Sequence, residues 1–143
     1  MLIEQISVFI ENQPGKLSEV TDILAQHQID ISALSLADTS DFGILRLIVD
    51  KPELAHQVLT EQGMVVKQTR VLAVSMADRP GGLAGVLRRI TDSGLSIEYM
   101  YAFVGKQDGK AVVVMRVNNP EAALEALSKA DGAVGNPRDI YRL

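Results

Sequence analysis

The chain has 143 residues, of which 47% are hydrophobic, and its 14 basic and 18 acidic residues give a net charge of −4. This composition suits one ordinary domain or two small ones with a packed core, and it excludes a disordered chain. A mildly acidic chain without a basic cluster is a poor match for nucleic acid. The sequence has no cysteine, which excludes disulfides, thiolate metal sites and cysteine nucleophiles.

The N-terminal residues lack the basic start and apolar block of a signal peptide, and no apolar run reaches the roughly 20 residues that span a bilayer. We therefore expect a soluble, cytoplasmic protein with no membrane partner. No metal-ligand spacing, Ser-His-Asp set or paired-carboxylate arrangement is visible, so we expect no metal, no cofactor and no enzymatic activity.

The first predicted elements are a strand, a helix and a second strand. Residues 2–10 alternate as a strand does. A helix is predicted from Pro14, which suits a first helical turn, and its apolar positions Leu17, Val20 and Leu24 recur at helical spacing. Residues 29–36 alternate again and are predicted to form a strand.

A polar turn at residues 38–41 then leads into a predicted strand at 42–49, whose two apolar faces are typical of a central strand. Asp50 is expected to cap a second helix that begins at Pro52. A further strand is predicted to begin at residues 64–66.

The same order of patterns then begins again. The predicted elements of the second half are strands at 71–76, 95–104 and 111–117, a helix after Pro80, a helix capped by Asn119, and a last strand near Ile140–Tyr141. Residues 64–76 contain no Gly or Pro. We therefore expect the chain to bend near 68–70 and to lead directly into a second, rigidly coupled unit.

The repeat is visible at single residues, since Pro14, Gly15 and Leu17 recur 66 positions later as Pro80, Gly81 and Leu83. Each unit is predicted to have the order β-α-β-β-α-β, and right-handed crossovers place both helices on one face of the sheet. The sequence thus predicts an α+β protein of two ferredoxin-like units, at residues 1–70 and 71–143.

Each copy of the repeated turn joins a strand to a helix through Pro-Gly. A helix start carries backbone N–H groups without intrahelical partners and a partial positive charge, and glycine permits close approach to the backbone. The turn can therefore hold a small anionic or zwitterionic molecule. The alternative is that both turns are only well-capped connections, with Asn12 and Asp78 as the caps.

With both turns and the repeat in place, the sequence resembles a tandem pair of ACT domains. The residues that carry the resemblance are the turns 12–17 and 78–83, with Val20, Leu24, Ile31, Val86, Ile90 and Ile97. The resemblance implies a regulatory module that binds amino acids. It also implies a continuous eight-stranded sheet, with the ligand where the domains meet.

The resemblance further implies which residues hold the ligand. Asn12 or Asp78 takes the ammonium group, backbone N–H groups take the carboxylate, and the second strand of the neighbouring unit completes the pocket. The implied ligand-binding residues are Asn12, Gly15, Lys16, Leu17, Asp78, Arg79, Gly81, Gly82, Leu83, Ser32, Glu98 and Tyr99. Because Asp78 is charged and Asn12 is not, we expect the second turn to bind more tightly.

The chain shows no catalytic domain, which most proteins with ACT domains carry. The resemblance therefore implies a stand-alone sensor, or a subunit that acts on a separate metabolic enzyme or regulator, with a homodimer as one option. Two rival functions stay open: an enzyme on a ferredoxin-like scaffold, and a structural assembly module without a ligand.

Overall fold

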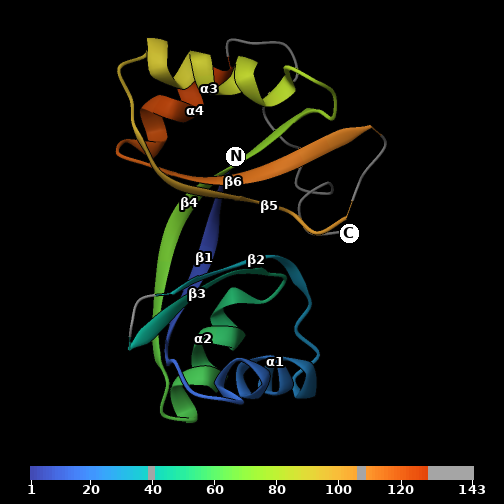
Figure 1. Ribbon diagram of the computed structural model, residues 1–143, viewed down its shortest axis with the longest axis vertical. Coiled ribbons are helices and arrows are strands. Elements are labelled where there is room, and N and C mark those ends of the chain that lie inside the picture. The colour runs from blue at the N-terminus through green and yellow to red at the C-terminus, as the bar shows by residue number, and fades with distance from the viewer. Residues whose placement is uncertain (39–40, 106–108, 129–143) are drawn as a thin grey trace. The chain divides into compact units, whose positions relative to one another are not determined.

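The computed structural model describes residues 1–38, 41–105 and 109–128. Within these residues the elements follow the predicted order, with six strands and four helices (Figure 1). The elements are β1 (Leu2–Glu11), α1 (Lys16–Gln26), β2 (Ile31–Asp38), β3 (Phe42–Val49), α2 (Pro52–Glu61), β4 (Val65–Ala77), α3 (Gly82–Asp92), β5 (Ile97–Ala102), β6 (Lys110–Val117) and α4 (Pro120–Ser128).

The strands are hydrogen-bonded in the order β2-β3-β1-β4-β6-β5. An eight-stranded sheet is therefore not observed among the described residues, because one strand, β4, occupies the stretch that was expected to hold the last strand of one unit and the first of the next. The strand expected near Ile140–Tyr141 lies outside the described residues.

The chain divides into two compact units. The first unit holds residues 4–69, and the second unit holds residues 1–3 together with the chain from residue 70. Residue 1 joins the second unit through its backbone, since the Ala73 N–H donates to the Met1 carbonyl at 2.8 Å and the Met1 ammonium donates to the Ala73 carbonyl at 3.0 Å. Burial lowers the pKa of this ammonium group.

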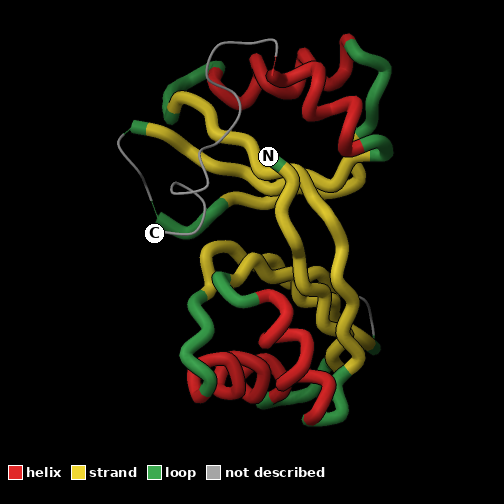
Figure 2. The backbone as a smooth tube through the Cα atoms, turned by 180° about the vertical axis from the view of Figure 1, so that it is seen from behind, coloured by secondary structure: helices red, strands yellow, loops and turns green. Residues whose placement is uncertain are grey.

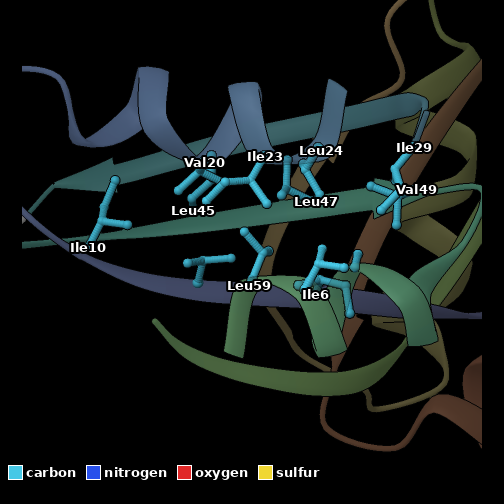
Figure 3. Close-up of a cluster of buried hydrophobic side chains, with 13 residues drawn as sticks. Ile6, Ile10, Val20, Ile23, Leu24, Ile29, Leu45, Leu47, Val49 and Leu59 are labelled. Atoms are coloured by element: carbon cyan, nitrogen blue, oxygen red, sulfur yellow. The ribbon is translucent and has the colours of Figure 1, made fainter. Parts of the chain in front are cut away.

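In the first unit, β3 pairs antiparallel with both β1 and β2. Helices α1 and α2 lie on one face of these strands (Figure 2). The apolar stripe of α1 and Leu59 of α2 point toward the strands, where Ile6, Leu45 and Leu47 face them (Figure 3). These side chains are fully or almost fully buried, so the predicted amphipathic patterns meet in one hydrophobic core.

In the second unit, β6 pairs antiparallel with both β4 and β5. Helices α3 and α4 cover one face of these strands (Figure 2). The core of this unit repeats the plan of the first, with strand residues Leu72, Val74 and Met115 packed with Val86 and Ile90 of α3.

The hydrogen bonds also repeat, and they correct one prediction. The Asp50 carboxylate accepts the Asp30 N–H at 2.9 Å, as the Asn118 side chain accepts the Ser96 N–H at 3.0 Å. Helix α2 instead begins after Lys51, without a side-chain cap hydrogen bond. The prediction that Asp50 caps α2 is wrong, because its side chain holds the start of β2 against the end of β3.

The core assignment predicts different costs for two leucines that are register partners. Leu34 of β2 lies opposite Leu47 of β3; Leu47 is 0% exposed and Leu34 is 41% exposed. We expect Leu47→Ala to lower the free energy of unfolding by about 2–5 kcal/mol, and Leu34→Ala to change it by less than about 0.5 kcal/mol. Urea denaturation followed by circular dichroism measures both, and equal losses would contradict this core.

Candidate functional site

The two Pro-Gly turns have the same backbone hydrogen bonds. In the first turn there are four such bonds, each from an N–H group to a carbonyl: Asn12 to Asp41, Gln13 to Glu11, Lys16 to Gln13, and Glu19 to Gly15. In the second turn the four equivalent bonds run from Asp78 to Gly109, Arg79 to Ala77, Gly82 to Arg79, and Gly85 to Gly81. The repeat seen in the sequence is therefore also a repeat of backbone hydrogen bonding.

Each turn enters its helix through a left-handed glycine. Gly15 has φ 85° and Gly81 has φ 86°, and they are the N-cap residues of α1 and α3. The N-cap position of each helix is thus a glycine without a side chain that could cap it, and Asn12 and Asp78 lie three residues before it. A Cβ atom added at either glycine would meet nothing within 4 Å. The glycines are required by backbone conformation, and their surroundings are open.

At the start of α1, after the first turn, two backbone N–H groups have no acceptor within the helix. The first hydrogen bond within α1 runs from the Glu19 N–H to the Gly15 carbonyl at 2.9 Å. The N–H groups of Leu17 and Ser18 precede it and have no intrahelical acceptor. Together with the helix dipole they make this end of α1 electropositive.

A cavity of about 160 Å³ opens beside this turn. Its lining comes from β1, the turn, α1, β2 and β3, and consists of Ile10, Glu11, Asn12, Gln13, Lys16, Leu17, Leu36, Asp38 and Gly43. All of these residues belong to the first unit.

The polar part of the lining carries both signs of charge. The Asn12 side-chain amide donates to the Asp38 carboxylate at 3.3 Å. Lys16 forms an ion pair with Glu19 at 3.7 Å, and the two side chains are 40% and 47% exposed. Such an exposed pair contributes little to stability, so Lys16 can turn toward another carboxylate at low cost.

The rest of the lining is apolar. Ile10 of β1 lies opposite Gly43 of β3, and a Cβ atom at residue 43 would lie 3.5 Å from Ile10 Cγ1 and 3.3 Å from Leu36 Cδ1. The missing side chain of Gly43 thus leaves room between two lining residues. The cavity lining thus combines one cation, Lys16, and two carboxylates, Glu11 and Asp38, with apolar side chains; this combination complements a zwitterion with an apolar side chain.

The structure places the predicted first-turn residues as follows. Asn12, Lys16 and Leu17 line this cavity, whereas Gly15 borders a neighbouring cavity of about 420 Å³ along α1. Ser32 is buried at the opposite end of β2 from Asp38, and its hydroxyl has no hydrogen-bond partner among the described residues. Ser32 and Asp38 are six positions apart along β2, which is roughly 20 Å.

Glu98 and Tyr99 are also far from the turn of their own unit. Tyr99 pairs with Arg116 of β6, whereas the second turn is hydrogen-bonded to Gly109. Arg116 and Gly109 are seven positions apart along the chain, which in an extended strand is roughly 23 Å. Glu98 forms an ion pair with Arg116 at 3.6 Å. A ligand role for Ser32, Glu98 and Tyr99 stays a prediction.

The sequence analysis did not identify six of the lining residues, which are Ile10, Glu11, Gln13, Leu36, Asp38 and Gly43. Asp38 was assigned to a polar turn, but it is the last residue of β2 and pairs with Gly43. The signal that could have found it is the strand register, because an antiparallel β2 and β3 that meet at residues 38 and 43 end beside the first turn.

In the second turn, Gly82 is tightly enclosed. A Cβ atom there would clash with the Ala77 carbonyl oxygen, which is backbone and cannot give way easily. Asp78 and Arg79 are exposed in the same turn, and Leu83 lies in the first turn of α3 at 39% exposure.

Within residues 1–38, 41–105 and 109–128, no group of three or more His, Cys, Asp and Glu side chains could hold a metal ion. In this part of the chain no helix has the length and the apolar character that crossing a membrane requires.

Comparison with known proteins assigns the family. Residues 1–134 match the family described as ACT domain pair, and the chain belongs to that family. A search of curated proteins gave no match. The crystal structure of protein BT0572 from Bacteroides thetaiotaomicron is 39% identical, with a TM-score of 0.91 over 100% of this chain and 98% of that one.

Regulatory subunits of aspartate kinase have a similar fold. That from Thermus thermophilus, in its ligand-free form, is 19% identical with a TM-score of 0.65, over 92% of this chain and 97% of that one. That from Thermus flavus is 21% identical with a TM-score of 0.60, over 90% and 94%. At this identity the likeness shows the fold alone. The family match over residues 1–134 confirms the resemblance to a tandem ACT pair.

The enclosure of Gly82 predicts opposite effects for two alanine substitutions in α3. Gly82→Ala forces the new Cβ against the Ala77 carbonyl, so we expect a loss of about 1–3 kcal/mol. Gly85, in the same helix, has nothing within 4 Å of an added Cβ atom, so Gly85→Ala should stabilise the protein by roughly 0.5–1 kcal/mol. Melting temperatures of the two variants measure this, and a neutral Gly82→Ala would disprove the close approach.

Proposed function

We propose that the chain is an amino-acid-binding regulatory module and that its ligand occupies the cavity beside the first turn. Membership in the ACT domain pair family supports the binding of an amino acid. The observation that carries the proposal is the cavity lining, in which Asp38 and Lys16 supply opposite charges beside apolar side chains.

In this proposal the ligand's ammonium group bonds to the Asp38 carboxylate, which Asn12 orients through its amide. A charge-assisted bond of this kind is about twice as strong as a neutral one. The ligand's carboxylate meets Lys16 and the N–H groups at the start of α1. Its side chain lies against the apolar lining formed by Ile10 and Leu36.

The size of the cavity limits the ligand. Sites for drug-sized molecules measure about 300–1,000 Å³, whereas this cavity measures about 160 Å³. A free amino acid with a small or medium apolar side chain suits this space better than a peptide or a nucleotide does.

The regulatory part of the proposal rests on two structural relatives whose names describe regulatory subunits of aspartate kinase. A module of this kind acts by binding its ligand in one state of a partner more tightly than in another. We propose that this chain reports an amino acid to a separate enzyme or regulator in the same manner.

A thermal-shift screen against the twenty L-amino acids tests the proposal. A ligand that binds only the folded state must raise the melting temperature, by an amount equivalent to about 2.7 kcal/mol at a hundred times Kd. We expect one amino acid or a few related ones to do so. Their deaminated and decarboxylated analogues should not, because each lacks one of the two charges.

A screen in which no amino acid changes the melting temperature would contradict the proposal. It would favour the structural assembly module, whose turns have only a folding role.

A further inference from the structure

The two units share their turn backbone but differ in the side chains around it. We propose that the chain holds one amino acid, at the first turn, and that the second turn is not a ligand site. This inference rests on the proposed function. Its evidence is a comparison of three cavity positions with their counterparts in the repeat: Lys16 with Gly82, Asp38 with Val104, and Gly43 with Ala111.

The position of Lys16 in the first turn carries no cation in the second. Gly82 stands 66 residues after Lys16, and the backbone hydrogen bonds at the two positions are the same. A Cβ atom at residue 82 would clash with the Ala77 carbonyl oxygen. Any side chain at residue 82 would meet this clash, and the second turn has no side chain at the position from which Lys16 reaches the first cavity.

At the position equivalent to Asp38, the second unit carries no carboxylate. Val104 stands 66 residues after Asp38, and it is an apolar side chain that is 54% exposed. An ammonium group at the corresponding place would face a valine. It would lose water without gaining a charge-assisted bond.

The space left by Gly43 is also filled in the second unit. Ile10 pairs with Gly43 in the first unit, and Met76 pairs with Ala111 in the second, so the two positions correspond in register. Ala111 carries the methyl group that Gly43 lacks. In the first unit such a methyl would lie 3.3 Å from Leu36 and 3.5 Å from Ile10, both of which line the cavity.

Asp78 carries a charge that Asn12 lacks, and this difference is the reason why the sequence predicts tighter binding at the second turn. The first cavity removes that advantage, because its carboxylate comes from β2 as Asp38 and is held by Asn12. The charges of the first site lie on separate elements around a cavity. Asp78 and Arg79 are neighbours within one exposed turn.

Equilibrium dialysis tests the inference. The full chain is dialysed to saturation against a mixture of the twenty L-amino acids, and the bound amino acids are identified and counted per chain. The same experiment is run on Asp38→Asn and Lys16→Met in the first turn, and on the matched pair Asp78→Asn and Arg79→Met in the second. A melting curve for each variant verifies that it is folded.

We expect one bound amino acid per chain. Asp38→Asn and Lys16→Met should each weaken its binding at least about tenfold, and the second-turn variants should bind like the wild type. Two bound amino acids per chain, or a loss confined to the second-turn variants, would overturn the inference while the proposed function stands. No bound amino acid at all would overturn both.

Discussion

The structure depends on how the first helix of each unit begins, which is without a side-chain cap. In each unit the strand turns into its first helix through a glycine in the left-handed region, at φ 85° for Gly15 and 86° for Gly81. This entrance replaces a side-chain cap, so the first N–H groups of the helix have no partner within it. The geometry that permits the turn is thus also the geometry that makes it electropositive and accessible.

The duplication separates what folding needs from what binding needs. Both turns keep the same four backbone hydrogen bonds, and both units bury the same kind of strand and helix residues. The side chains that surround the turns are under no such constraint, and there the units diverge: Lys16 and Asp38 have Gly82 and Val104 as counterparts. Fold similarity alone therefore does not give two equal sites.

The sequence predicted the fold well because its evidence was local. Apolar periodicity gave the order of the elements within the described residues, and the repeated Pro-Gly turns gave the two units. It failed where long-range pairing decides. Asp50 looks like a helix cap, but its carboxylate bonds to Asp30 across the sheet. Asp38 looks like a turn residue, and only the register of β2 against β3 brings it beside the first turn.

The central claim is that an amino acid binds at the entrance of α1, and amide NMR tests it most directly. The ¹⁵N-labelled chain is titrated with each of the twenty L-amino acids in turn. The amino acid that binds should move the backbone resonances of Leu17 and Ser18 and the side-chain amide resonances of Asn12. The resonances of Leu83 and Ala84, at the equivalent places of α3, should stay unchanged. Movement at Leu83 and Ala84 instead, or no movement at α1 with any amino acid, would contradict the account.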